Sequence, residues 1–431
     1  MGSPDQRKRQ ELKLIGDEAR SDGVCHCRRR SHTTFPAEAR AFPAGCRQHP
    51  PPGDQAMPAA PLRRRTFLGR SCAAAGSLAA AMPVTVPAGG FFAGGGDTLR
   101  VGLIGCGGRG TGAAIQAAAA DPAVRITVLA DLFADHIDSA AAVLGRATAG
   151  AFECPQEQRF VGTAAWRQAI AAPLDIVILA TSPDARPAQV AAAVAAGRHV
   201  FCEAPAAIDS DGVAMILAAV TLAENRGLAF GSGLAWRHDP ATIGMIDSLH
   251  AGGFGRPVAG VATSHIGPAW RRCGPQGRPV PDADPRNWIA CRSRSGGDLV
   301  EHQVHAIDKM LWAFGDEPPM VAEPLASPGD DGTLVRYRFA GGQVLEAGIV
   351  RRPGGRDRID ELVRGDAGSC DLRTAGAGRH ARALAAFVRS IREGTPLAEG
   401  RTLCRSTLTA ILGREAAAAG RPLPWPTPAP A

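Results

Sequence analysis

Lysine is almost absent from this sequence. Among its 431 residues, 48 are lysine or arginine, and only Lys8, Lys13 and Lys309 are lysines. Arginine therefore supplies nearly all of the positive charge. A function that needs a lysine ammonium beyond residue 13 has Lys309 alone to supply it.

Closely spaced metal-binding residues are also missing. The 11 cysteines are spread singly apart from Cys25 and Cys27, and no CxxC pair or His/Cys cluster with zinc spacing occurs. Structural zinc sites depend on such clusters, so we predict no metal site. This number of unpaired thiols favours folding in a reducing compartment.

A basic surface for nucleic acid is absent from most of the chain. Residues 1–70 hold 14 Lys and Arg against 7 Asp and Glu, so they carry the whole net charge of +7. The remaining residues are neutral overall. Because nucleic-acid binding needs a basic footprint on the folded domain, we predict no nucleic-acid partner.

The N-terminal region has the features of an export signal. Residues 1–56 are polar, rich in Arg and Pro, and predicted to be disordered or untranslated, with Met57 as the true start. Residues 57–96 resemble a twin-arginine signal and linker, with Arg64 and Arg65 as the pair; the alternative is an ordinary basic linker. The apolar stretch at 71–86 is too short to span a membrane. We expect recognition by the twin-arginine export machinery, a periplasmic or secreted location and no stable membrane insertion.

A glycine-rich turn follows the first apolar run of the remaining chain. Leu99–Ile104 predicts a short strand, and Gly105-x-Gly107-x-x-Gly110 opens an alanine-rich helix. In this pattern the first glycine permits the turn, the second lets a diphosphate approach the backbone, and the third lets the helix lie close to the sheet. The alternative is a simple glycine turn.

An acidic residue stands at the right distance from this turn. Residues 124–130 predict a second strand, and Asp131 ends it, 26 residues after Gly105. A carboxylate there accepts a hydrogen bond from a ribose 2′-hydroxyl and repels a 2′-phosphate. No arginine follows it directly, so we predict NAD rather than NADP as the cofactor.

Alternating strands and helices predict an α/β protein with two domains and two tails. The first domain, residues 97–232, is expected to be a doubly wound parallel sheet of the Rossmann type. The second, residues 233–420, is expected to be an α/β domain with a largely antiparallel open sheet for substrate binding and oligomerisation, followed by a Pro-rich tail at 421–431. The predicted strands are 175–180, 199–202, 229–231, 258–265, 334–339 and 344–349; the predicted helices are 135–144, 166–171, 187–196, 210–225, 240–251, 380–392 and 402–419, with a polar loop at 267–296.

One histidine has the surroundings of an acid or base. His305 is predicted near the start of a helix, with Glu301 four residues earlier and Asp308 three residues later. These spacings share a helix face, so a carboxylate would orient the imidazole. Such an imidazole can exchange a proton with a substrate hydroxyl. The alternative is a structural histidine.

Four motifs in this order resemble the Gfo/Idh/MocA family of NAD(P)-dependent sugar oxidoreductases: the glycine turn, Thr181–Pro183, Glu203-x-Pro205 and Glu301-x-x-x-His305. The resemblance covers about residues 98–420 and is greatest for exported members. It implies a sugar substrate, a homo-oligomer, and a sheet that lines the substrate site. The implied cofactor-binding residues are Gly105, Gly107, Gly108, Arg109, Gly110, Asp131, Thr181, Pro183, Glu203 and Pro205; the implied catalytic residues are Glu301, His305 and Asp308, with Arg237, His238 and Trp288 toward substrate.

One position departs from the family. Its usual Glu-Lys-Pro motif is Glu203-Ala204-Pro205 here, and alanine provides neither a cation nor a donor. We expect Lys309 to face solvent, which leaves Arg237 and His238 as candidate replacements.

Three functions follow from these features. The leading one is NAD-dependent oxidation or reduction of a sugar, with His305 as the acid/base. The second is a redox-neutral glycoside hydrolase or lyase, because a branch of the family with that chemistry also lacks the lysine. The third is a catalytically silent NAD-binding protein.

Overall fold

Six parallel strands form the first sheet, in the order β3-β2-β1-β4-β5-β6. The computed structural model describes residues 98–267, 280–281, 284–325, 332–351 and 357–426, so the predicted tail and export signal lie outside the described residues. This strand order is that of the Rossmann fold, and the predicted doubly wound sheet is confirmed. The strands are β1 (Leu99–Ile104), β2 (Val124–Asp131), β3 (Arg159–Val161), β4 (Ile176–Leu179), β5 (His199–Cys202) and β6 (Phe230–Ser232).

Helices connect these strands, as the sequence predicted. Strand order reverses between β1 and β4, and their carboxyl ends therefore flank the crevice where such sheets bind ligands. Asp209 begins one helix by accepting a hydrogen bond from the backbone N–H of Gly212 at 2.8 Å. The helices are α2 (Gly108–Ala120), α3 (Ala134–Ala147), α4 (Ala165–Ala171), α5 (Arg186–Ala195) and α6 (Ser210–Asn225).

A second sheet has the order β12-β11-β7-β10-β9-β8-β13. Only the β7–β10 pair is parallel, so the predicted largely antiparallel sheet is confirmed. Within the region predicted as a Pro-rich tail, Leu423–Pro424 pairs with β8, whereas 427–431 lie outside the described residues. The strands are β7 (Pro257–Ile266), β8 (Val321–Pro324), β9 (Gly332–Arg338), β10 (Val344–Arg351), β11 (Arg358–Gly365), β12 (Ser369–Asp371) and β13 (Leu423–Pro424).

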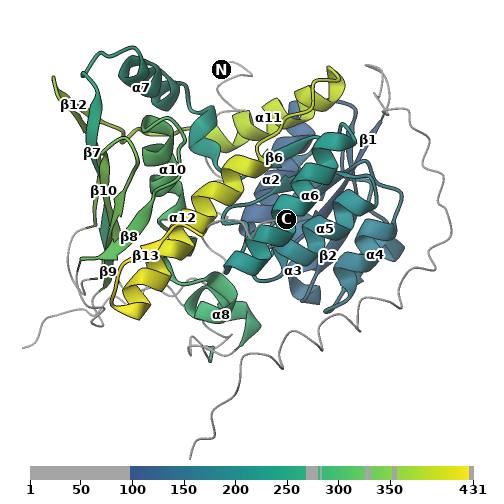
Figure 1. Ribbon diagram of the computed structural model, residues 1–431. Helices are drawn as coiled ribbons and strands as arrows, with labels where there is room; N and C mark the ends of the chain where they lie inside the picture. Colours follow the sequence, from purple (N-terminus) through teal and green to yellow (C-terminus); the bar gives the residue numbers. More distant parts are fainter. Residues whose placement is uncertain (1–97, 268–279, 282–283, 326–331, 352–356, 427–431) are drawn as a thin grey trace, which may run out of the picture. The chain divides into compact units, whose positions relative to one another are not determined.

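The last two long helices contact the first sheet and its helices. α11 (Arg379–Arg392) packs on α2, and the ring of its Phe387 lies 5.6 Å from that of Phe201 in β5. α12 (Gly400–Ala419), yellow in Figure 1, contacts both α6 and the strands β8 and β9. The C-terminal helices thus join both sheets in one compact unit. Nowhere in the described ranges is a helix both long enough and apolar enough to cross a membrane.

Short helices lead from the first sheet into the second. η2 (Ala235–His238) and α7 (Pro240–His250) precede β7. Part of the predicted polar loop is helical, as η3 (Pro285–Ala290) and α8 (Arg292–Ser295), while residues 268–279 and 282–283 lie outside the described residues. α9 (Asp298–Glu301) and α10 (Val304–Ala313) follow, so the single helix expected around His305 is divided into two.

Candidate active site

The three motif glycines have different surroundings. A Cβ on Gly105, whose φ is +96°, would lie 2.6 Å from the Ala180 backbone, and one on Gly110 would overlap the Gly105 carbonyl oxygen. A Cβ on Gly107 would have nothing within 4 Å. The outer glycines are therefore required by the packing of the chain. Gly107 instead faces open space, which fits the approach of a diphosphate to the backbone.

A pocket of about 260 Å³ lies beside this turn. It brings together four of the predicted cofactor residues, Gly105, Gly107, Asp131 and Thr181. The described residues thus form a concave site at the carboxyl ends of β1 and β4, where a dinucleotide fits the Rossmann arrangement.

Asp131 is held at the end of β2 by three hydrogen bonds. Its Oδ2 accepts from the backbone N–H of Cys106 at 2.7 Å, and its Oδ1 accepts from the N–H of Phe133 at 2.9 Å. The His136 Nδ1 lies 3.1 Å from the same Oδ1. These contacts fix the carboxylate at the pocket wall. Sequence reasoning did not identify His136. Its position in the first turn of the helix after Asp131 could have predicted this contact.

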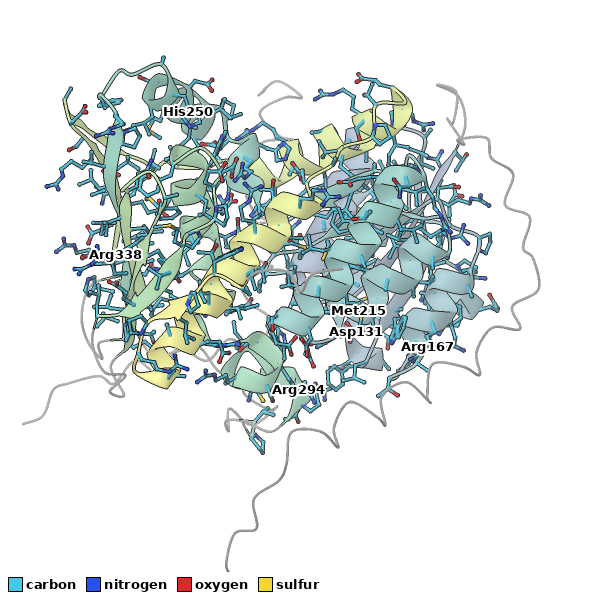
Figure 2. The ribbon with its side chains drawn as sticks, viewed as in Figure 1. Asp131, Arg167, Met215, His250, Arg294 and Arg338 are labelled. Carbon is cyan, nitrogen blue, oxygen red and sulfur yellow. The ribbon has the colours of Figure 1, made fainter. Side chains whose placement is uncertain are left out.

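Residues from the second half of the chain complete the same pocket. The guanidinium of Arg286 lies 3.9 Å from the centroid of the Phe133 ring and pairs with Asp135 at 2.8 Å. Arg294 on α8 and Asp131, both labelled in Figure 2, also line the pocket. Trp288 belongs to this lining too. Trp288, which the resemblance places toward the substrate, thus lines the same pocket as the glycine turn.

An ion pair links the glycine turn to the Glu-Ala-Pro motif. The Nε of Arg109 donates to Oε1 of Glu203 at 2.8 Å, and Glu203 is only 6% exposed. Behind it, a Cβ on Gly233 would collide with the Glu203 carboxylate. Arg109 is therefore engaged with the motif, and Glu203 is a paired carboxylate rather than a free one.

Arg186 holds the loops at the ends of β4 and β5. This buried side chain donates to the carbonyl oxygens of Thr181 at 2.6 Å, Glu203 at 3.1 Å and Pro205. Its Nε has no hydrogen-bond partner among the described residues. Arg186 is thus a cation beside the Ala204 backbone that sequence reasoning missed, because its partners are backbone atoms that no side-chain pattern reveals.

Glu301 is half-buried, and its Oε2 atom is buried without a hydrogen-bond partner in the described part of the chain. Burial is the main reason that its pKa rises to about 8; Glu203 raises it further and the Arg186 guanidinium lowers it. The group is therefore mostly protonated at pH 7 and can donate a hydrogen bond.

His305 lies near the start of α10, and its imidazole has no hydrogen bond to any described residue. Burial, followed by the positive charge of Arg379, lowers the pKa of His305 to about 4. Its imidazole is neutral at pH 7, which is the form that accepts a proton. The common neighbour Arg186 acts on the pKa values of both His305 and Glu301.

The predicted contact between His305 and Asp308 is wrong. Asp308 is 1% exposed and accepts hydrogen bonds from Arg237 at 2.8 Å and from the Ser406 hydroxyl at 2.8 Å. Arg237 also pairs with Asp316 at 2.6 Å. This buried network connects η2, α10 and α12, so Asp308 and Arg237 stabilise the fold, and Asp308 makes no hydrogen bond to His305.

The other expected cations are engaged as well. The His238 Nε2 lies 2.7 Å from Oε1 of Glu399. Lys309, expected at the surface, is fully buried, pairs with Glu361 and lies 4.2 Å from the centroid of the Trp236 ring. That expectation is wrong because the long-range partner Glu361, 52 residues away, compensates the buried charge.

Replacing Glu301 by Gln should make stability less dependent on pH. The pKa of Glu301 rises from 4.5 to about 8 on folding, so the native state retains a proton that the unfolded chain releases. Wild-type stability should therefore fall as the pH increases through this window, and E301Q should lose that fall. Melting temperatures at pH 5 and pH 9 measure this fall in stability. Replacement of the exposed Glu317 by Gln is the control. An equal change in melting temperature between the two pH values for wild type and E301Q would contradict the raised pKa of Glu301.

No group of three or more His, Cys, Asp or Glu side chains in the part of the chain that the structure describes is arranged to hold a metal ion. The site contains instead the cofactor-type pocket, the Arg109–Glu203 pair, and the neutral His305 and Glu301.

Comparison with curated proteins gives partial alignments to sugar and inositol enzymes. A 1,5-anhydro-D-fructose reductase from Ensifer adhaerens is 25% identical over 181 residues, which are 40% of this chain and 49% of the relative. An inositol 2-dehydrogenase from Rhizobium meliloti (strain 1021) is 27% identical over 229 residues, 53% of this chain and 59% of the relative. The chain spans about half the length of these relatives.

Solved structures share the fold. A levoglucosan dehydrogenase in complex with NADH and levoglucosan superimposes with a TM-score of 0.60 at 20% identity, covering 77% of this chain and all of that one. The model of the oxidoreductase family named GFO_IDH_MocA, described as an NAD-binding Rossmann fold, matches residues 99–234. The predicted cofactor agrees with this match. Residues 99–234 therefore match the NAD-binding Rossmann fold of this oxidoreductase family.

Proposed function

We propose that this protein is an NAD-dependent oxidoreductase that acts on a sugar or sugar derivative, with His305 as the acid/base. The observation that carries the proposal is the neutral, half-buried imidazole of His305, which has no hydrogen-bond partner among the described residues. The relatives named above, an anhydrofructose reductase and an inositol dehydrogenase, support a polyol or sugar as substrate.

His305 would accept the proton of a substrate hydroxyl during oxidation. NAD held in this pocket would supply the hydride acceptor for the hydrogen of the carbinol carbon. The neutral imidazole takes the hydroxyl proton and returns it in the reverse direction. Glu301, with its pKa of about 8, would donate a hydrogen bond to a neighbouring substrate oxygen. Asp131 would bind the ribose, and Gly107 would leave room for the diphosphate.

Ala204 favours a second candidate, a redox-neutral glycoside hydrolase or lyase. The small side chain is only 8% exposed and brings no donor to the site. A net oxidation must be followed by a second substrate that resets the cofactor, whereas a redox-neutral cycle needs none. The third possibility, a silent NAD-binding protein, rests on the same residue.

Export and assembly belong to the same proposal. We infer from Arg64 and Arg65 that the protein uses the twin-arginine machinery and acts in the periplasm or outside the cell. A cofactor bound before export of the folded protein would suit an enzyme that regenerates it. We also infer a homo-oligomer, because β11 exposes Ile359 and Leu362, 46% and 40%, on the second sheet.

One assay set separates the three functions. The purified protein with bound NAD is offered sugars and aryl glycosides, and both nicotinamide absorbance and released aglycone are recorded. Absorbance change with sugars supports the oxidoreductase, whereas aglycone release without net absorbance change supports the redox-neutral cycle. Silence in both readouts, with NAD present, overturns the two enzyme proposals.

A further inference from the structure

Several positively charged side chains act on His305, and they outnumber the unpaired carboxylates around them. Arg379 and Arg109 both act on the pKa of His380, which burial lowers to about 3 as the main cause. The pKa of His305 is lowered mainly by burial and further by the positive charges of Arg379, Lys309 and Arg186. These side chains come from α2, α5, α10 and α11, so the fold assembles one basic cluster.

The carboxylates near this cluster do not neutralise it. Glu203 is already paired with Arg109. Glu361 is paired with Lys309. Asp239, whose negative charge acts on the pKa of Arg379, is paired with Arg382 at 2.9 Å. Glu301, whose pKa is about 8, is mostly uncharged at pH 7. The cluster therefore has excess positive charge, and a ligand with a negative charge would be attracted to it.

Among the described residues, two cations of the cluster, Arg186 and Arg379, lack a carboxylate partner; Arg186 is buried, whereas Arg379 is partly exposed. Arg379 lies at the start of α11, and no carboxylate lies within ion-pair distance of its guanidinium in the described residues. Its Nη1 donates to the Gly376 carbonyl at 3.0 Å. The donors left over match the planar geometry of a carboxylate.

The orientation of Arg379 is fixed by an aromatic ring. Its guanidinium carbon lies 4.2 Å from the centroid of the Trp236 ring, and a Cβ on Gly376 would overlap that ring. The Lys309 ammonium lies 4.2 Å from the same centroid. Trp236 is thus held by two cations, and Arg379 is positioned before any ligand arrives, which lowers the entropy cost of binding.

We propose that the substrate is a sugar acid and that Arg379 binds its carboxylate. The inference rests on the proposed function and adds the substrate class. The bound carboxylate supplies the negative charge that the basic cluster lacks. Because the charge of Arg379 acts on the pKa values of both His305 and His380, a carboxylate bound to it would make both rings better proton acceptors, so binding and proton transfer would reinforce each other.

Calorimetry on the NAD-saturated protein tests this without requiring turnover. The probes are three sugar acids, D-glucuronate, D-galacturonate and D-gluconate. Each is compared with its uncharged counterpart, which is D-glucose, D-galactose and D-glucitol, respectively. D-glucose 6-phosphate serves as a sugar with a different negative group. At least one acid should bind more tightly than its counterpart, and Arg379→Gln should weaken that binding by about 10- to 150-fold. Arg379→Lys should recover part of it because the charge remains.

A control on the same helix is Arg389→Gln, since Arg389 is 67% exposed in the last turn of α11. It should leave acid binding unchanged. The proposal is overturned if no acid binds better than its counterpart, if R379Q leaves the preference intact, or if the phosphate binds better than every acid. A loss of NAD affinity in R379Q would assign the residue to the cofactor and overturn it too.

Failure of the proposed function gives a different result. Hydride transfer is followed by absorbance in the same samples. Acid binding that depends on Arg379 but produces no absorbance change supports the ligand class and contradicts the oxidoreductase. Turnover of uncharged sugars that does not depend on Arg379 supports the oxidoreductase and contradicts the sugar-acid substrate.

Discussion

Replacing His305 by Asn should lower kcat/KM for the sugar substrate by about 10²–10⁴-fold, the usual contribution of a positioned acid or base. The neutral imidazole has no hydrogen-bond partner among the described residues, so the folded protein does not rely on it for a contact. Asparagine fills similar space and cannot accept the proton at neutral pH. The affinity for NAD, measured by fluorescence titration, should stay unchanged.

His302→Asn is the matched control, because His302 is half-buried three residues away and its Nε2 lies 3.8 Å from Asp298. It should retain nearly full activity. The pH profile of wild-type kcat/KM adds a second readout. Activity should fall below about pH 4, where His305 becomes protonated, and above about pH 8, where Glu301 loses its proton. An H305N variant that is as active as wild type would remove His305 from the mechanism.

The first sheet could be predicted from sequence because its signals are local. The strand before Gly105, the helix after it and Asp131 at the next strand end all lie within 33 residues of Leu99. Periodicity found the helices to within a few residues. It missed β3, whose three residues, Arg159–Val161, carry too short a pattern to stand out from a loop.

The charged partners could not be predicted because they are far apart along the chain. Asp308 has the helical spacing that would bring it near His305. Its carboxylate instead accepts a hydrogen bond from Arg237, which is 71 residues away in sequence. Lys309 is buried because Glu361 and Trp236 reach it from other elements. Spacing rules describe neighbours on one helix, whereas a buried charge is decided by whichever element packs against it.

The missing lysine also has a different meaning once the structure is known. A single position, Ala204, suggested a loss of positive charge from the site. The structure shows Arg186 beside that backbone and Arg379 near His305, so cations are present but in other places. Their guanidinium groups remain protonated at neutral pH and cannot serve as proton acceptors. This leaves proton transfer to the imidazole and gives the arginines a role in binding and positioning.

Replacing Gly107 by Ala should weaken NAD binding by about 5- to 150-fold, the effect of forcing one extra methyl into a filled site. In the protein alone, the added Cβ has nothing within 4 Å, and the backbone of Gly107, with φ −70° and ψ 179°, is one that alanine adopts readily. The methyl group therefore collides with the diphosphate and not with the chain. The melting temperature without cofactor should change little, and the increase in melting temperature on adding NAD should shrink.

Gly110→Ala is the informative contrast, since its Cβ would overlap the Gly105 carbonyl oxygen. That variant should lower the melting temperature even without NAD, because strand β1 and helix α2 can no longer approach each other closely. Gly107 and Gly110 belong to one motif, yet Gly107 leaves space for the ligand, whereas Gly110 allows the strand and the helix to pack closely. If G107A binds NAD as tightly as wild type, the diphosphate does not lie over Gly107, and the cofactor must enter the pocket beside Asp131 in another orientation.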